Sequence, residues 1–375
     1  MALPMTSEDL LGPRLVTPSL PEGLDTPAVV IDLDVLEANI EAMAQAMAAR
    51  GVALRPHFKT PKMIEVARRQ LAAGSSGLTC ATVGEAEVLA DAGVNDVFIA
   101  YPVWPSGARA LRLRALCDRI DLKVGVDSAA AAQALARAVA RPVRVLVEID
   151  CGDRRTGVPP EHAGVIAAAA ADAGLTVQGV FTHGGQGYAP GERSRQAAEE
   201  EVAALQRAAA ALQACGLPAG TVSAGSTPTA VLSARGVVTE ERPGTYVFGD
   251  RQQVVIGSCR PQDIAAVIAS TVVSTAVSGQ FVLDAGAKTI GKDRPPWLPG
   301  HGAIPAYPQA VISRVSDHHA VCEVPDGARR PRVGEVVAVV PNHICPVVNL
   351  ATEVVVARRG QQITRWTVDA RAHNT

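Results

Sequence analysis

Aromatic residues make up only 3% of the 375-residue chain, and no hydrophobic run reaches the roughly 18 residues that a membrane helix needs. Charge of one sign is also lacking: 35 Lys and Arg against 37 Asp and Glu leave a formal net charge of −2, which offers no basic field to nucleic acid or to an anionic membrane. The 7 cysteines are odd in number and form no CxxC pair, which indicates free thiols in a reducing cytoplasm. Acids and prolines near the N-terminus replace the basic and apolar regions of a signal peptide. We therefore expect a cytoplasmic protein without nucleic-acid or membrane partners.

What is present is a globular composition, with 48% hydrophobic residues, 33 Gly and 26 Pro. Short β-branched runs alternate with Ala-rich stretches of helical spacing, and about eight such pairs favour a (β/α)8 TIM barrel over 25–255, in the α/β class. The strands are expected at 52–58, 78–82, 96–101, 121–126, 143–149, 177–182, 221–224 and 244–248, and the helices at 36–49, 61–73, 83–92, 129–138, 160–173 and 193–215.

Beyond residue 255 the helical spacing ends and strands dominate, which predicts a C-terminal all-β domain over 256–375. Residues 1–24 are interpreted as an N-terminal arm that packs on this domain. The expected strands of the domain are 264–276, 280–285, 319–324, 335–340, 353–357 and 362–369.

The first barrel strand ends in LRPHFKTPK, where Arg55, His57 and Lys59 occupy alternate positions on one side. Cationic groups that point into a barrel are costly unless an anion or a function compensates them. Active sites of these barrels lie at the C-terminal ends of the strands, so Lys59 is a candidate reactive amine. The alternative is a solvated surface lysine.

The segments SAGSTPT and ERPGTYVFG follow the expected seventh and eighth strands, where such barrels bind phosphate. Their small side chains leave backbone N–H groups and hydroxyls free to approach a phosphate, which suits a phosphorylated aldehyde cofactor. Two ordinary glycine turns are the alternative. The candidate residues are Gly225, Ser226, Thr227, Gly244, Thr245 and Tyr246.

The segment PNHICP places His343 and Cys345 two residues apart at the end of a hydrophobic strand, so that both side chains project to one side. An imidazole and a thiolate suit zinc, with coordination positions left for water or substrate. The alternative is a core histidine beside an inert buried cysteine.

Taken together, PHFKTPK, VEIDCGDRRTGV, FTHGGQGY, SAGSTPT, ERPGTYVFGDRQQ, LDAGAKT and PNHICPVVNL resemble the D-serine dehydratase and D-threonine aldolase group of pyridoxal-phosphate enzymes. The resemblance runs over nearly the whole chain. It implies the alanine-racemase-like fold, a barrel followed by a β domain, with pyridoxal 5′-phosphate as cofactor and a homodimer as the assembly.

Residue by residue, the resemblance implies that Lys59 binds the cofactor covalently, beside His57. Arg242 matches an arginine that faces the pyridine nitrogen, and His183 matches a histidine that supports this arginine. Because an arginine there does not give up its proton, the ring nitrogen stays unprotonated and the cofactor is a weaker electron sink. Arg155 matches an arginine near the phenolic oxygen, although its neighbour Arg154 is an alternative.

For the metal, the resemblance identifies His343 and Cys345 with the family's metal pair, with Cys as in the D-serine dehydratases. The aldolases carry a carboxylate at the second position and use a harder ion. We therefore expect zinc, with manganese or magnesium as alternatives. Gln186 and Tyr188 are candidate contacts to the substrate, or part of a plain glycine-rich turn.

The sequence thus predicts a lyase that dehydrates D-3-hydroxy amino acids to a 2-keto acid and ammonia. The same site can break the Cα–Cβ bond of D-threonine or 3-hydroxyaspartate and release glycine and an aldehyde. A racemase would need a second acid or base, for which Tyr307 is the one tyrosine of the β domain. A non-catalytic carrier of pyridoxal phosphate would need neither the β domain nor the H-x-C pair.

Overall fold

A computed structural model describes residues 14–16 and 18–375, which form two compact units. One unit combines the described residues up to Ile40 with Thr245–Arg371, and the other combines Glu41–Gly244 with Ala372–Thr375. Our expected barrel began at residue 25, whereas the structure pairs Ala28–Asp32 with strands of the β unit. Residues 1–13 and 17 of the expected N-terminal arm lie outside the described residues; Leu15, Leu20 and Leu24 pack against a core cluster of the β unit.

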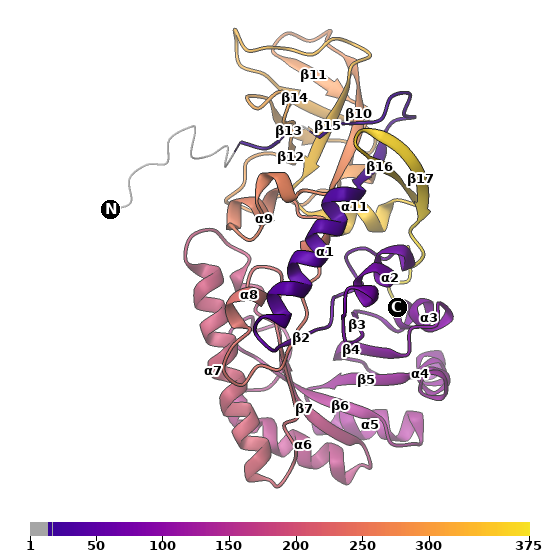
Figure 1. Cartoon of the computed structure of the whole chain (residues 1–375), viewed down its shortest axis with the longest axis vertical. Helices are drawn as coiled ribbons and strands as arrows, with labels where there is room; N and C mark the ends of the chain where they lie inside the picture. Colours follow the sequence, from indigo (N-terminus) through magenta and orange to yellow (C-terminus); the bar gives the residue numbers. More distant parts are fainter. Residues whose placement is uncertain (1–13, 17) are drawn as a thin grey trace. The chain divides into compact units, whose positions relative to one another are not determined.

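The barrel unit confirms the expected fold: eight parallel strands run in the order β2-β9-β8-β7-β6-β5-β4-β3 (Figure 1). Backbone hydrogen bonds from Phe58 N–H to the Thr79 carbonyl (2.7 Å) and from Thr79 N–H to the Pro56 carbonyl (2.8 Å) connect the two ends of this order. The strands are β2 (Ala53–Leu54), β3 (Leu78–Cys80), β4 (Asp96–Pro102), β5 (Asp121–Val126), β6 (Arg144–Ile149), β7 (Thr176–Thr182), β8 (Thr221–Ala224) and β9 (Glu240–Glu241).

Two helices of the barrel unit begin at residues whose side chains cap them. Thr82 accepts a hydrogen bond from the Glu85 N–H (3.0 Å), and Ser128 does the same for Ala131 (3.2 Å). Helix α4 was not expected, because only Leu113 and Leu116 of its Arg-rich sequence are buried and its apolar stripe is correspondingly narrow. The helices are α2 (Ile64–Ala72), α3 (Val83–Asp91), α4 (Gly107–Arg119), α5 (Ala129–Val139), α6 (Ala163–Asp172), α7 (Arg193–Ala214) and α8 (Ala230–Ser233), with short 3₁₀ turns η1 (Pro160–His162) and η2 (Gly185–Gly187); α1 (Leu33–Ala48) enters from the other unit.

The eighth strand lies earlier than expected. The prediction of a strand at 244–248 is wrong: β9 is Glu240–Glu241, and Thr245–Val247 forms the 3₁₀ turn η3. Pro243 has no N–H to donate to a central ladder, so the strand ends before it. The residues Arg242, Pro243 and Gly244 nevertheless follow the last strand of the barrel directly, as the loop prediction required.

The core of the barrel contains a small aromatic cluster. The rings of Phe98 and Phe181 meet edge to face, with centroids 5.1 Å apart, and Leu146 packs with them. Gly125 is required beside them, because a Cβ at this position would lie 2.7 Å from the Phe181 ring. This layer lies under the polar residues that follow the strands.

The β unit contains a nine-stranded sheet in which β1 (Ala28–Asp32) pairs antiparallel with β10 and parallel with β16 (Figure 1). The strands at 264–276, 280–285, 319–324, 335–340, 353–357 and 362–369 are found within two residues of their predicted ends, whereas β1, β12 and β13 were not predicted. Among the described residues, no helix is both long and apolar enough to cross a membrane. The remaining elements are β10 (Ala266–Ser274), β11 (Gln280–Leu283), β12 (Gly302–Ala303), β13 (Val311–Val315), β14 (Ala320–Glu323), β15 (Val336–Pro341), β16 (Glu353–Arg358), β17 (Gln361–Thr367), α9 (Arg251–Ile256), α10 (Ala287–Ile290), α11 (Ile344–Leu350) and η4 (Pro261–Asp263).

Candidate active site

Lys59 lies in the barrel segment between β2 and α2, on the way to the next strand, β3. The Phe58 N–H donates to the Thr79 carbonyl (2.7 Å), and the Lys62 N–H donates back to the Phe58 carbonyl (2.9 Å), so the backbone on both sides of Lys59 is held. The Lys59 N–H also lies 3.4 Å from His57 Nδ1. The lysine is half-buried, and its position is set by the barrel wall.

Arg55 does not belong to the same cluster. Its guanidinium is buried and donates to Glu240 Oε2 (2.6 Å) and to Asp96 Oδ1 (2.6 Å). These protein carboxylates compensate its charge, so of the three alternating groups only His57 and Lys59 remain candidates for binding an external anion.

The imidazoles of His57 and His183 lie among cations. Burial and the charges of Lys59, Arg242 and Arg155 hold the pKa of His57 well below its usual value, and the same causes lower the pKa of His183 to about 3. Both rings are therefore neutral near pH 7, and the positive charge of the cluster belongs to the lysine and the two arginines. Such a donor set fits a phosphate ester with a phenolate oxygen.

Arg242 is buried against the aromatic layer of the barrel. Its Nη1 donates to Ser223 Oγ (2.6 Å) and its Nη2 donates to the Thr182 carbonyl. The guanidinium carbon lies 5.4 Å from the ring centroid of Phe181 and 5.9 Å from that of Phe98. These contacts fix the guanidinium in one place. The side chain of His183 hydrogen-bonds with the backbone of Gly225.

Buried side chains hold the loop after β8 through hydrogen bonds. The Gly225 N–H donates to the buried carboxyl of Glu201 (3.1 Å), so this N–H points into the barrel wall and not toward a bound phosphate. Gly225 stays a predicted residue of the phosphate loop, with its own N–H engaged by Glu201. The Ser226 N–H is taken by the Thr229 hydroxyl (3.1 Å), and Ser226 Oγ lies 3.0 Å from the same hydroxyl. Thr227 is buried next to them.

Gly244 packs directly on the segment that carries the lysine. A Cβ at Gly244 would lie 2.8 Å from Thr60 Oγ1 and 3.2 Å from His57 Cβ, so any side chain would displace one of them. This narrow space fits a cofactor loop that must approach closely. Thr245 and Tyr246, which follow in η3, belong to the β unit, where both are buried.

Two neighbouring arginines were candidates for the phenolic oxygen. Arg154 adopts a left-handed backbone (φ 53°), and its N–H donates to Asp150 Oδ1 (3.0 Å). Arg155 lies 3.8 Å from Asp153, and its charge acts on the nearby histidines. Because the charge of Arg155 acts on both histidines, Arg155 stays the predicted contact to the phenolic oxygen.

The loop after β7 contains Gln186 and Tyr188. The Gln186 amide donates to Glu200 Oε2 (2.8 Å) and to the Cys151 carbonyl (3.2 Å), so this amide is already engaged in hydrogen bonds within the protein. The Tyr188 ring lies 6.3 Å from the ring of His183, beside the cationic cluster. Of the two substrate candidates, the tyrosine is the better placed.

In the β unit, His343 and Cys345 come together through a turn. The prediction that they alternate along a strand is wrong: β15 ends at Pro341, His343 is the N-terminal cap residue of α11, and Cys345 lies in the first turn of that helix. The two side chains hydrogen-bond with each other, and Thr245 Oγ1 lies 3.9 Å from the Cys345 sulfur. An imidazole and a sulfur in contact fit a zinc ion.

Two aspartates surround this pair. Asp293 Oδ2 lies 2.6 Å from His343 Nδ1, which leaves Nε2 as the ring atom for a metal. Buried Asp250 accepts the Ile344 N–H (3.1 Å) and fixes the start of the helix. Burial alone would lower the pKa of His343, but Cys345, Asp293 and Asp250 together raise it to about 11, so a metal must displace protons here.

No group of three or more His, Cys, Asp or Glu side chains in the described residues is arranged to hold a metal. The metal site expected from the sequence consists of the pair His343 and Cys345. Such a site leaves positions open to water and substrate, as catalytic zinc sites do.

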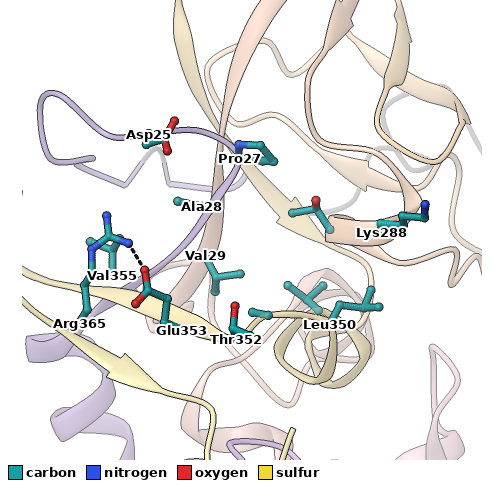
Figure 2. Close-up of a pocket in the computed structure, with 13 residues that line it drawn as sticks. Asp25, Pro27, Ala28, Val29, Lys288, Leu350, Thr352, Glu353, Val355 and Arg365 are labelled. Carbon is teal, nitrogen blue, oxygen red and sulfur yellow. Dashed lines mark hydrogen bonds and ion pairs between the residues drawn. The ribbon is translucent and has the colours of Figure 1, made fainter. Parts of the chain in front are cut away.

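A separate cavity of about 320 Å³ lies in the β unit, next to the ion pair between Glu353 and Arg365 (2.5 Å) (Figure 2). It is lined by parts of β1, α10, α11 and β16, and by none of the candidate residues.

Sequence reasoning missed four acidic residues: Asp293, Asp250, Glu201 and Glu241. Asp293 reaches His343 across 50 residues, Asp250 reaches Ile344 across 94 and Glu201 reaches Gly225 across 24. Glu241, in contrast, stands next to Arg242 in the segment ERPGTYVFG, and only its contact with the loop after β8 is distant. No local motif signals such a contact.

Comparison with known proteins agrees with this geometry. The family profile "Alanine racemase, N-terminal domain" matches residues 31–252, and "Putative serine dehydratase domain" matches residues 265–357. The chain is 38% identical to D-threo-3-hydroxyaspartate dehydratase of Delftia sp. (strain HT23), over 86% of this chain and 91% of that protein. It is 34% identical to a D-threonine aldolase of Arthrobacter sp., over 98% and 99% of the two chains.

Among solved structures, the D-threonine aldolase from Filomicrobium marinum superimposes with a TM-score of 0.86, at 30% identity over 96% of this chain and 99% of that chain. A variant of D-threo-3-hydroxyaspartate dehydratase, solved in a metal-free form, superimposes with a TM-score of 0.85 at 36% identity, over 92% and 97%. The barrel with its lysine, the β domain and these matches together show that the chain belongs to the D-serine dehydratase and D-threonine aldolase family of pyridoxal-phosphate-dependent lyases with the alanine-racemase-like fold.

Proposed function

We propose that this chain is a pyridoxal-phosphate- and metal-dependent dehydratase that converts a D-3-hydroxy amino acid to a 2-keto acid and ammonia. The substrate loses its α-proton and its 3-hydroxyl as water, and the released enamine takes up water to give the keto acid and ammonia. The similarity to D-threo-3-hydroxyaspartate dehydratase of Delftia, which is 38% identical over 86% of this chain, supports this reaction.

The barrel residues would hold the cofactor. Lys59 supplies the amine for the cofactor aldehyde, and its neighbours His57 and His183 stay neutral because burial and nearby cations lower the pKa of both rings. Arg155 and Arg242 supply fixed positive charge. When bound, pyridoxal phosphate acts as the electron sink that stabilises negative charge at Cα. Gly225, Ser226, Thr227, Gly244, Thr245 and Tyr246 are the proposed phosphate-loop residues.

Lys59 is also the proposed base for the α-proton. The backbone on both sides of Lys59 is held by hydrogen bonds, and the charge of Lys59 acts on both histidines. Tyr188, beside His183, is a proposed contact to the substrate. Gln186 is a weaker proposal for that role, because its amide already bonds to Glu200 and to the backbone of Cys151.

The contact between His343 and Cys345 is the observation that carries the dehydratase proposal. Hydroxide is a poor leaving group, and a bound zinc would act as the Lewis acid that assists its departure. A thiolate and an imidazole select zinc over the harder manganese or magnesium. Asp293 orients the imidazole, and Asp250 fixes the helix start on which both ligands depend.

Product analysis tests the proposal. The purified protein is loaded with pyridoxal phosphate and zinc and incubated with D-serine, D-threonine or D-threo-3-hydroxyaspartate. Dehydration gives pyruvate, 2-oxobutyrate or oxaloacetate, each with an equal amount of ammonia. A chelator should stop turnover and added zinc should restore it. Full turnover in a metal-free preparation would refute the role given to His343 and Cys345.

Retro-aldol cleavage is the second candidate, and the aldolase that matches 98% of this chain favours it. Here a group at the metal would deprotonate the 3-hydroxyl, and the Cα–Cβ bond would break. The same incubations separate the two reactions, because cleavage of D-threonine gives glycine and acetaldehyde instead of 2-oxobutyrate and ammonia.

We also propose that the protein is a cytoplasmic homodimer. All seven cysteines lie within the described residues, and none forms a disulfide, which fits a reducing compartment. Light scattering after gel filtration measures the mass and tests the dimer directly.

A further inference from the structure

Two carboxyl groups meet beneath the loop after β8. Glu201 comes from α7 and Glu241 from the end of β9, and both side chains are fully buried. Glu201 Oε1 accepts the Gly225 N–H (3.1 Å), and a Cβ at Gly225 would lie only 2.0 Å from Glu241 Oε2. A Cβ at Gly184, in the preceding loop, would lie 2.7 Å from the Glu201 carboxyl carbon. The two acids therefore pack against the loop glycines themselves.

The hydrogen bonds of this pair are incomplete. Ser233 Oγ donates to Glu241 Oε1 (2.8 Å). Glu201 also accepts hydrogen bonds from the Thr229 side chain and the Gly184 backbone, whereas within the part of the chain that the structure describes Glu241 Oε2 has no hydrogen-bond partner. A buried oxygen without a donor is costly, and two adjacent buried carboxylates repel each other. One proton held by the pair removes both penalties.

The charges around the pair agree with a single proton. Arg242 is the cation that faces both acids, and Glu240 and Glu148 are the other carboxyls near this arginine. Glu240 is already paired with Arg55 (2.6 Å).

Two further groups complete the surroundings. Glu148 accepts a hydrogen bond from Thr156 Oγ1 (2.7 Å). Burial and the neighbouring Glu201 charge raise the pKa of the Cys151 thiol to about 11, so this thiol stays neutral. A second negative charge on the pair would therefore add to buried negative charge that already faces Arg242, so one proton on the pair lowers this excess.

We propose that Glu201 and Glu241 hold one proton between them and act as positioning residues that keep the cofactor's phosphate loop closed. The inference rests on the proposed function, since it assumes that Ser226 and Thr227 contact the phosphate of pyridoxal phosphate. The bond from Gly225 to Glu201 directs that N–H inward and so sets the direction of the residues that follow. Loss of the proton places two carboxylates against one glycine, and the loop opens.

The pH dependence has a definite sign. Burial, and then the neighbouring Glu201, raise the pKa of Glu241 well above its usual value. The stabilisation is therefore complete at pH below the ordinary carboxyl pKa and is lost as pH rises through the value in the folded protein. Cofactor affinity should fall by up to about tenfold per pH unit beyond that point.

The dissociation constant of pyridoxal phosphate, measured by equilibrium dialysis between about pH 6 and pH 9, tests the proposal. Glu241→Gln is neutral and nearly isosteric, so it should bind the cofactor like wild type at low pH and lose the alkaline weakening. Glu199→Gln, an exposed acid on the same helix α7, is the matched control and should follow wild type. The ionisation of the cofactor and of Lys59 affects all three proteins alike.

Infrared spectroscopy of the wild type provides a measurement that needs no folded variant. A protonated carboxyl band should persist at about pH 8, above the pKa of about 6 to which burial raises Glu148 and Asp250. Absence of that band overturns the proposal, as does an identical pH dependence of cofactor binding in wild type and Glu241→Gln. Failure of the wild type to bind pyridoxal phosphate at any pH would instead contradict the proposed function.

Discussion

Replacing Asp293 by Ala tests how His343, a proposed metal ligand, is held. The substitution removes the acceptor that lies 2.6 Å from His343 Nδ1 and leaves the tautomer and the angle of the ring unset. Removal of such an orienting partner typically weakens metal binding by about 10- to 100-fold, or about 1.4 to 2.7 kcal/mol. The His343 and Asp293 side chains are 35% and 45% exposed, so water compensates in part and we expect the lower half of this range.

Zinc affinity, measured by competition with a chromogenic chelator, gives the magnitude without any assay of turnover. Asp293→Asn keeps an oxygen acceptor and should recover most of the affinity. Asp317→Ala is the matched control: Asp317 is an exposed aspartate of the same unit, paired with Lys288 at 3.3 Å, and its loss should leave zinc affinity unchanged. Equal zinc affinity in wild type and Asp293→Ala would refute the orienting role.

Four further predictions address the barrel and the metal pair. Lys59→Ala should abolish turnover and the visible absorbance of lysine-bound cofactor; a borohydride-reducible adduct that persists in this variant would contradict the assignment. Gly244→Val should lose cofactor affinity by at least about tenfold, because its Cβ would lie 2.8 Å from Thr60 Oγ1, and dialysis against free cofactor measures this. Cys345→Asp should shift metal preference from zinc toward manganese and raise the ratio of aldehyde to keto acid, which metal analysis and product assays record. Burial and nearby cations lower the pKa of His183 to about 3, so the free energy of unfolding should fall as pH drops below about 6.5; urea titrations should show a smaller pH slope for His183→Asn.

Much of the fold follows from local patterns. Alternating β-branched runs and Ala-rich amphipathic stretches predict the barrel, because the spacing of hydrophobic residues within each βα unit distinguishes its strand from its helix. Pro243 shows the limit of this reasoning: a β-rich segment, TYVFG, follows it, yet the ladder ends before the proline and the segment forms a turn. Strand β1 is a second case, since only its partners β10 and β16 decide which sheet it joins.

The reactive groups divide in the same way. The sequence by itself was enough to propose Lys59, the glycine loops and the His343 and Cys345 pair, because these are short motifs whose chemistry is contained in adjacent residues. Only the tertiary structure decided which groups surround them: Asp293 reaches His343 across 50 residues, and Glu201 reaches Gly225 across 24. A hydrogen bond or a shared proton depends on distances of about 3 Å between side chains from different elements, and packing alone sets those distances.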